Sequence, residues 1–162
     1  MTRCLSALLL VGFVTAAGAA PEAPEAAFTP HYVSQRPDKA YMREGPSFDH
    51  KVMWVYQHKG YPLLVTASFD VWRRVLDVDG TTGWMSAQML SDKRTVLVIG
   101  DGRVVLHASD DPASKMVGMA EAGAILDLKA CERNACRVAA EGVDGWIDKS
   151  RAWGVSSDEV FK

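Results

Sequence analysis

Several patterns are scarce in this chain of 162 residues, and each scarcity excludes a class of protein. The 18 Lys and Arg residues nearly balance the 20 Asp and Glu residues, and no basic block occurs, so no nucleic-acid partner is expected. No apolar run approaches the roughly 20 residues that span a bilayer. The longest segments with a helical pattern, 86–90 and 149–153, amount to one turn each. A helical or membrane-spanning protein is therefore not expected.

Sequence motifs of common catalytic and metal sites are also missing. There is no Gly-x-Ser-x-Gly elbow, no Ser-x-x-Lys and no His-Glu-x-x-His. The four histidines have no partner at a recognised metal-ligand spacing, and no aspartate series completes a calcium loop. We therefore predict a chain that is not an enzyme and that uses no metal and no cofactor.

The first twenty residues are typical of a secretory signal peptide. Arg3 supplies a short positive start, residues 5–16 are apolar, and a small-x-small pattern places cleavage after Ala19. A retained membrane anchor is the alternative, but an apolar run of about twelve residues is short for a span. Cys4 precedes that run, whereas a lipoprotein cysteine would follow it. The mature chain is expected to be periplasmic or secreted, with no membrane span.

The mature chain keeps two cysteines, Cys131 and Cys136, on either side of a polar turn between two strand-like segments. Because an exported chain meets an oxidising compartment, we expect them to form a disulfide across a hairpin. Its short loop limits the stabilisation. A redox dithiol is the alternative, but the Cys-x-x-Cys spacing and a following helix are both absent.

Strand signals dominate the rest of the sequence. Six short segments are rich in β-branched, aromatic and aliphatic residues: 52–56, 63–67, 72–76, 95–99, 104–106 and 124–128. Turn residues such as Asp79-Gly80 and Gly100-Asp101-Gly102 separate them. Short strands at this spacing predict an all-β fold, either a barrel or a sandwich.

An internal repeat divides the mature chain into two copies of about 60 residues. Residues 80–85 (GTTGWM) are similar to residues 142–147 (GVDGWI), and the first glycine precedes tryptophan by four positions in both. Arg43 and His107 each precede a lysine by eight residues. Aligning Trp72-Arg73-Arg74-Val75 with Cys136-Arg137-Val138 puts Cys136 in the aromatic position of the second copy.

These motifs resemble bacterial SH3 (SH3b) domains. Residues 41–47 (YMREGPS) resemble the family's opening motif of Asn, apolar, Arg, x, Gly, Pro, Ser, and Lys59-Gly60, residues 72–75 and residues 80–85 follow in the family's order. Segments 69–74 and 89–95 look like those of exported tandem-SH3 proteins of alphaproteobacteria. Tyr41 replaces the usual Asn, and the second copy departs further, with residues 107–112 reading HASDDP. The resemblance implies two tandem small SH3-like barrels that bind cell-wall peptides or protein partners without catalysis.

The signal peptide, the internal repeat and the resemblance to bacterial SH3 domains together predict the organisation of the chain. It comprises a signal peptide at 1–19, a Pro/Ala/Glu tether at 20–30, a first barrel at 31–91, a second barrel at 92–155 and a C-terminal tail at 156–162.

Seven motif residues are expected to be structural: Arg43, Gly45, Pro46, Gly83, Trp84, Gly145 and Trp146. Trp84 and Trp146 are expected in the core, behind turns that paired glycines make tight. Arg43 is expected to bond loop carbonyls rather than a ligand.

Five residues of the first copy are candidates for ligand binding: Trp54, Tyr56, Trp72, Arg73 and Arg74. Alternation puts Trp72 on the face of Arg74, as a half-exposed ligand platform or as edge packing, and its replacement by alanine is expected to weaken binding without unfolding the chain. Trp54 and Tyr56 share one strand, where one face leaves an aromatic pair outside. The arginines would pair with a carboxylate or form a solvated strand edge.

The leading hypothesis is an exported module that recognises a peptide, in peptidoglycan or in an envelope protein, through an aromatic groove of the first copy. The alternative is a structural adaptor whose barrels pack against an envelope protein partner.

Overall fold

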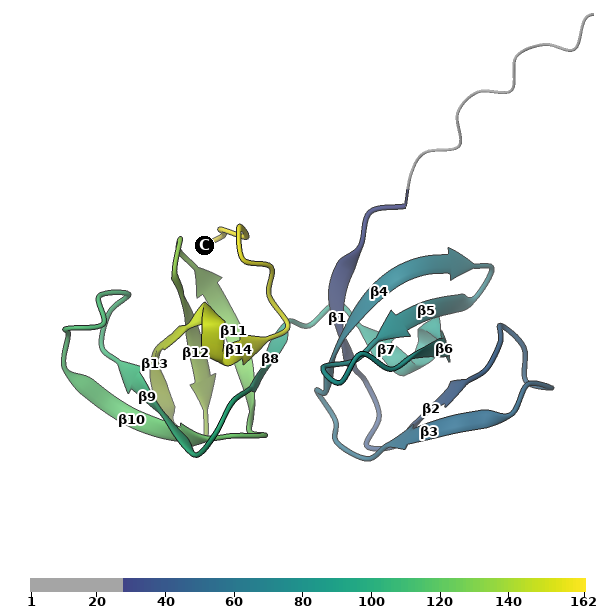
Figure 1. Cartoon of the computed structure of the whole chain (residues 1–162), viewed down its shortest axis with the longest axis horizontal. Helices are drawn as coiled ribbons and strands as arrows, with labels where there is room; N and C mark the ends of the chain where they lie inside the picture. Colours follow the sequence, from purple (N-terminus) through teal and green to yellow (C-terminus); the bar gives the residue numbers. More distant parts are fainter. Residues whose placement is uncertain (1–27) are drawn as a thin grey trace, which may run out of the picture.

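The computed structural model describes residues 28–162. The predicted signal peptide and most of the predicted tether lie outside these residues. The chain forms two antiparallel sheets of seven strands, and each sheet rolls into a small barrel (Figure 1). Across residues 28–162, no helix has the length and apolarity that a membrane crossing requires.

The first barrel holds seven strands and one short 3-10 turn. They are β1 (His31–Gln35), β2 (Ala40–Arg43), β3 (Val52–Tyr56), β4 (Pro62–Phe69), β5 (Trp72–Leu76), β6 (Thr82–Ser86), η1 (Ala87–Met89) and β7 (Leu90–Ser91). The strand order is β3-β2-β6-β5-β4-β1-β7.

The second barrel repeats this plan. Its elements are β8 (Thr95–Val98), β9 (Arg103–His107), β10 (Met116–Glu121), β11 (Ile125–Cys131), β12 (Ala135–Ala140), β13 (Val143–Asp148), η2 (Lys149–Arg151) and β14 (Ala152–Trp153). The order β10-β9-β13-β12-β11-β8-β14 matches the first barrel strand for strand. The prediction of an all-β protein with two tandem barrels is confirmed.

Each barrel has its own apolar core, built by residues that alternate along the strands. Fully buried side chains include Met42, Leu63, Val65, Val75 and Met85 in the first barrel and Val96, Val98, Val138 and Ile147 in the second. The alternation of apolar residues that predicted the strands therefore also identifies which side of each strand faces the core.

The repeated tryptophans lie on the faces opposite the cores. Along β6, Gly83 and Met85 are buried while Trp84 between them is half-buried, and Trp146 of β13 is placed in the same way. The expectation that both tryptophans are core residues was wrong, because Met85 and Ile147 occupy the inward positions. The glycine before each tryptophan permits close strand approach: a Cβ on Gly83 would lie 2.9 Å from the Arg43 carbonyl oxygen.

Strand register aligns the two barrels residue by residue. Trp84 pairs with Arg43 and Arg74, and Trp146 pairs with His107 and Arg137. Two further register pairs are equivalent in the two barrels: Trp72 lies opposite Ser86, and Ala135 lies opposite Asp148. Ala135, and not Cys136, therefore takes the place of Trp72. The sequence alignment was one residue out because the first barrel has two consecutive arginines where the second has one.

Cys131 and Cys136 form the predicted disulfide. They face each other in the register of the β11–β12 hairpin, with Cα atoms 4.0 Å apart, and both side chains are fully buried. The disulfide therefore closes the tip of this hairpin from inside the second barrel.

The two barrels are in contact at the junction between β7 and β8. Thr95 Oγ1 donates a hydrogen bond of 2.6 Å to the Gly60 carbonyl oxygen. The rings of Tyr32 and Trp153 meet edge to face, with centroids 5.6 Å apart. A polar bond and an aromatic contact thus link residues of β1 and the β3–β4 loop to β8 and β14.

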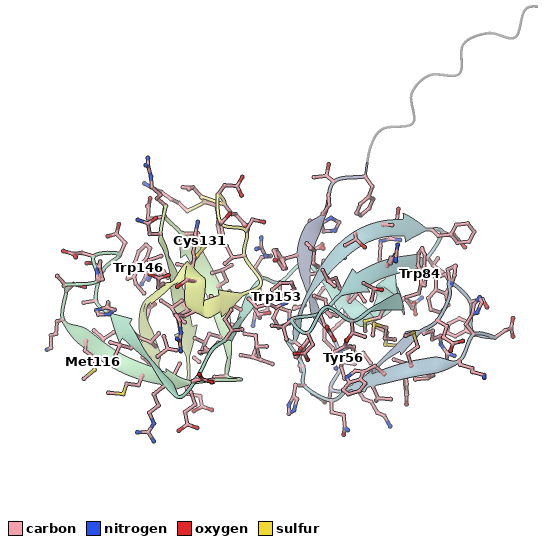
Figure 2. The ribbon with its side chains drawn as sticks, in the orientation of Figure 1. Tyr56, Trp84, Met116, Cys131, Trp146 and Trp153 are labelled. Atoms are coloured by element: carbon pink, nitrogen blue, oxygen red, sulfur yellow. A yellow bond between two sulfur atoms is a disulfide. The ribbon has the colours of Figure 1, made fainter. Side chains whose placement is uncertain are left out.

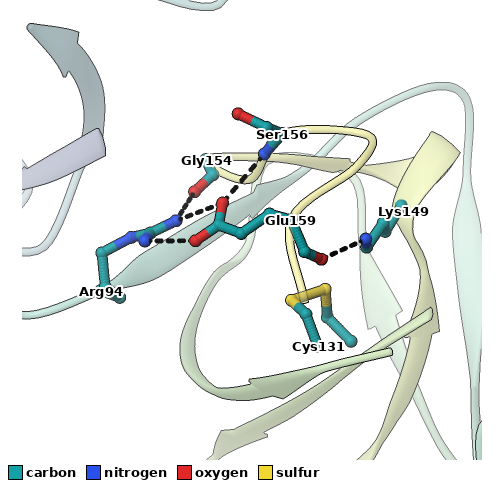
Figure 3. Close-up of polar contacts among 7 residues, drawn as sticks. Arg94, Cys131, Lys149, Gly154, Ser156 and Glu159 are labelled. Carbon is teal, nitrogen blue, oxygen red and sulfur yellow. Dashed lines mark hydrogen bonds and ion pairs between the residues drawn. A yellow bond between two sulfur atoms is a disulfide. The ribbon is translucent and has the colours of Figure 1, made fainter. Parts of the chain in front are cut away.

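The C-terminal segment is held against the second barrel by an ion pair (Figure 3). Nη1 and Nη2 of Arg94 donate to the Glu159 carboxylate, at 2.6 and 3.1 Å, and Nη2 also donates to the Gly154 carbonyl oxygen. The Ser156 amide donates to Glu159, and Lys149 Nζ donates to the Glu159 carbonyl oxygen at 2.5 Å. Glu159 thus holds this segment together with Phe161, whose amide and carbonyl both bond to the backbone of Cys131, at 3.0 and 2.8 Å.

Replacing Glu159 with glutamine is expected to lower the free energy of unfolding by about 2 kcal/mol at pH 7, because a partly buried pair with charge-assisted hydrogen bonds loses one charge. The side chains of Arg94 and Glu159 are only 25% and 23% exposed. Urea unfolding of both proteins measures the difference. Glu121→Gln is the control, because its pair with Arg103 is largely exposed and its loss should change little.

The same pair should make stability depend on pH. Burial by itself would raise the pKa of the Glu159 carboxyl, but the bonds from Arg94 and Ser156 and the charges of Arg94 and Lys149 bring it below its ordinary value of 4.5. The contribution is therefore complete above that value and lost as pH falls through the lower folded pKa. Unfolding measured from pH 7 to pH 3 should show wild type and Glu159→Gln converging, and parallel curves would contradict the assignment.

Candidate functional site

The five residues predicted to bind a ligand do not form one surface. Trp54, on β3, is 57% exposed, whereas Tyr56 on the same strand is only 5% exposed. Trp72 is likewise 5% exposed, Arg73 is half-buried and Arg74 is exposed. The expected exposed pair of Trp54 and Tyr56 is therefore wrong, as is the half-exposed state of Trp72.

Tyr56 is buried because its hydroxyl has a partner inside the first barrel. The hydroxyl donates to Asp77 Oδ2 at 2.8 Å, and the ring packs against that of Tyr61 with centroids 5.0 Å apart. Burial, with the hydrogen bond and charge of Asp77, raises the pKa of Tyr56 well above its ordinary value of 10. Asp77 also accepts from the amides of Asp79 and Thr81, so this cluster closes the turn between β5 and β6.

Trp72 is buried because a loop side chain covers the face that it shares with Arg74. The Phe48 ring meets the Trp72 ring at a centroid distance of 5.0 Å. The Arg43 guanidinium lies over Phe48 at 5.5 Å and donates to the carbonyl oxygens of Phe48 and His50, at 3.1 and 2.7 Å. The Phe48 ring, which is itself 71% exposed, thus caps this outer groove over Trp72, and Arg43 supports the loop that carries it.

Arg73 of β5 bonds to the backbone beside it. Arg73 Nη1 donates to the carbonyl oxygens of Asp70 and Trp72, both at 2.9 Å. Trp54 and Tyr56 line a separate small cavity of about 270 Å³ together with Tyr61, Asp77 and Asp79.

A cavity of about 420 Å³ opens on the second barrel, at the position equivalent to the covered groove of the first. Trp146 lines it from β13, on the outer side of the left-hand barrel in Figure 2. The cavity is lined by Val104, Val105, His107, Ser109, Asp110, Pro112, Asn134, Ala135, Trp146 and Asp148. Its size suits a small ligand or a peptide side chain with its flanking backbone.

Three replacements explain why this cavity is open. The loops after β2 and β9 have the same length and equivalent backbone bonds, Glu44 to Lys51 and Ala108 to Lys115, so Pro112 stands where Phe48 does. Ala135 stands where Trp72 does, and His107 where Arg43 does. Each replacement shortens a side chain that closes the groove in the first barrel.

The loop beside the cavity is held in place by local bonds. His107 Nδ1 lies 3.1 Å from the Ser114 carbonyl oxygen, the counterpart of the bond from Arg43 to His50. Asp111 Oδ1 accepts from the Ala113 amide at 2.9 Å, and the Ser114 hydroxyl donates to the Asp111 carbonyl oxygen at 2.7 Å. The cavity wall is therefore formed before any ligand arrives.

The cavity residues were missed at the level of sequence because the second copy departs from the family motif. Those departures were interpreted as a weaker site, and the groove was expected on the first copy. When the two copies are aligned by strand register, smaller residues stand where the first copy has Phe48 and Trp72, and this difference indicates an open groove in the second copy.

For metal binding, the described part of the chain offers no group of three or more His, Cys, Asp or Glu side chains that could hold an ion.

Comparison with known proteins identifies two matching segments. Residues 36–92 and 100–154 each match the bacterial SH3 domain family. The comparison with curated proteins finds no match.

Similar solved structures include NlpC2 and NlpC1 from Trichomonas vaginalis, both 10% identical with a TM-score of 0.36. The matches cover 77% and 79% of this chain and 48% and 47% of those chains. An NlpC/P60 family protein from Bacillus cereus is 13% identical with a TM-score of 0.33, over 75% of this chain and 55% of that one. The chain spans about half the length of these proteins.

Proposed function

Because the chain belongs to the bacterial SH3 domain family, we propose that it is an exported, non-catalytic binding module that recognises peptides, in peptidoglycan or in an envelope protein. Bacterial SH3 domains commonly bind cell-wall components and are typically not catalytic. The buried disulfide fits export to an oxidising compartment, the periplasm or the exterior.

The observation that carries the proposal is the preformed cavity of the second barrel. Grooves lined by aromatic residues accept extended peptide segments. Trp146 and Pro112 supply apolar walls, and Asn134 adds a polar group at the rim. The site of the proposed module therefore lies on the second barrel rather than on the residues predicted in the first.

A second candidate function, a structural adaptor, is favoured by one observation. The β2–β3 ribbon and the β9–β10 ribbon, both on the lower side in Figure 1, expose several apolar side chains. They are Val52, Met53 and Trp54 in the first barrel and Met116, Val117 and Met119 in the second. Apolar surface of this kind suits a protein partner better than a peptide side chain.

Co-sedimentation with isolated peptidoglycan sacculi tests the proposal. Wild type is expected in the pellet, and Ala135→Trp is expected in the supernatant, because an indole at this position occupies the cavity as Trp72 occupies the first groove. Trp54→Ala, a matched change on the exposed ribbon, should sediment like wild type.

Wild-type protein that stays in solution would contradict binding to the cell wall. Loss of sedimentation with Trp54→Ala but not with Ala135→Trp would place wall binding on the exposed ribbon and contradict the cavity as the site. Circular dichroism of each variant checks that the fold is retained.

A further inference from the structure

We infer that the cavity of the second barrel selects its peptide through a primary ammonium group carried on a methylene chain. The inference rests on the proposed function and names the chemical class that this one cavity accepts.

The charges around the cavity favour a cation. Asp110 and Asp148 are the acidic side chains in its lining, which also holds His107 but no lysine or arginine. Their counterparts in the first barrel are Pro46 and Ser86, both uncharged. The second barrel thus has two carboxylates beside the open groove where the first barrel has uncharged residues.

The carboxylates keep free acceptor capacity. Asp148 Oδ1 accepts from the Ser150 amide at 2.7 Å, which fixes the side chain at the start of η2 and leaves its second oxygen for another donor. Among residues 28–162, no side chain pairs with Asp110 within 4 Å. Each aspartate can therefore accept from an incoming ammonium without breaking an existing bond.

The neighbouring cations are placed elsewhere. Lys149 donates to the carbonyl oxygens of Ser157 and Glu159 (Figure 3 shows the second bond), and Arg137 pairs with Asp144. Arg133 does not line this cavity; it lines an adjoining cavity, whose lining also includes Asp148 and Lys149. Among residues 28–162, no lysine or arginine thus forms an ion pair with Asp110 or Asp148.

The apolar wall fits the chain that would carry the ammonium group. Trp146 offers an aromatic face, to which a cation is attracted and against which methylenes pack. Pro112 and Ala135 complete the apolar side of the cavity. Together with two carboxylates, this lining matches a lysine-like side chain better than an anion or an apolar group.

The probe is the tetrapeptide Ala-Ala-Lys-Ala, acetylated at its N-terminus and amidated at its C-terminus, so that the lysine ammonium is its only charge. It is titrated into the 15N-labelled full chain, and the indole N–H signal of Trp146 is followed, with a Trp146→Phe spectrum to assign it. The signal is expected to shift in a saturable way. The same peptide with Nε-acetyl-lysine should bind at least tenfold more weakly, because a charge-assisted pair is lost.

Two double variants separate a local contact from net charge. Asp110→Asn with Asp148→Asn should weaken binding at least tenfold, and asparagine at 148 still caps η2. Asp49→Asn with Asp92→Asn removes the same charge from exposed positions outside the cavity and should bind as wild type does. Ala135→Trp should abolish the shift.

Equal binding of the lysine and acetyl-lysine peptides, or equal weakening by both double variants, would overturn the inference. Sedimentation with sacculi without any shift of Trp146 would overturn it while the proposed function stands. A shift that follows the expected order without sedimentation would support the inference and remove the cell wall as the target.

Discussion

Replacing Trp72 with alanine is expected to lower the free energy of unfolding by about 3 kcal/mol, the usual cost of truncating a buried aromatic side chain. The side chain is 5% exposed and lies in edge-to-face contact with Phe48. Its loss leaves a void under Phe48 and removes the contact that holds the loop between β2 and β3. Urea unfolding, followed by circular dichroism, measures the change.

Trp54→Ala is the matched control for this prediction. Trp54 is also a tryptophan of the first barrel, but it is 57% exposed, so its loss should change stability by less than about 1 kcal/mol. Similar values for the two variants would mean that Trp72 is not covered in solution. That result would favour the hypothesis that Trp72 is a half-exposed platform for a ligand.

The second large effect is expected at Gly154, where the two barrels meet. Its φ of +118° lies in a region that favours glycine, and an added Cβ would collide with the Thr95 carbonyl oxygen. The same atom would lie 3.1 Å from Pro62 Cβ and 3.2 Å from Val96 Cα. Gly154→Ala therefore combines backbone strain with a clash against backbone atoms, and should cost about 3 kcal/mol or more.

Gly142→Ala is the control that separates backbone strain from the steric clash of the added Cβ. Gly142 has a φ of +84°, and an added Cβ there would meet no atom within 4 Å. Its replacement should cost only about 1 kcal/mol, the strain of a left-handed residue. Thermal unfolding of both variants gives the comparison, and equal losses would show that close packing at the barrel junction does not contribute.

Sequence patterns predicted the repeat, the strands and the disulfide because these features depend on residues close together in the chain. Alternating apolar residues mark an inward face, and turn residues mark its ends. Cys131 and Cys136 lie on either side of one turn, so the hairpin alone brings them together. The same local rule put Trp72 on the face of Arg74.

The sequence could not decide whether that face is covered. The burial of Trp72 depends on Phe48, which reaches it from another loop, and the burial of Tyr56 depends on Asp77 across the barrel. Neither contact has a periodic signal, because side chains from distant segments make it. The candidate site was therefore assigned to a groove that is filled.

By itself, then, the sequence determined a protein of two similar small barrels with one hairpin disulfide, since local alternation, turn residues and the repeat are sufficient for that. Only the tertiary structure decided in which barrel this groove is open. Pro112 and Ala135 replace Phe48 and Trp72 at positions far apart in the chain, and their effect exists only where the fold brings them to one surface beside Trp146. Local patterns determine strands, whereas a binding site depends on what long-range packing leaves uncovered.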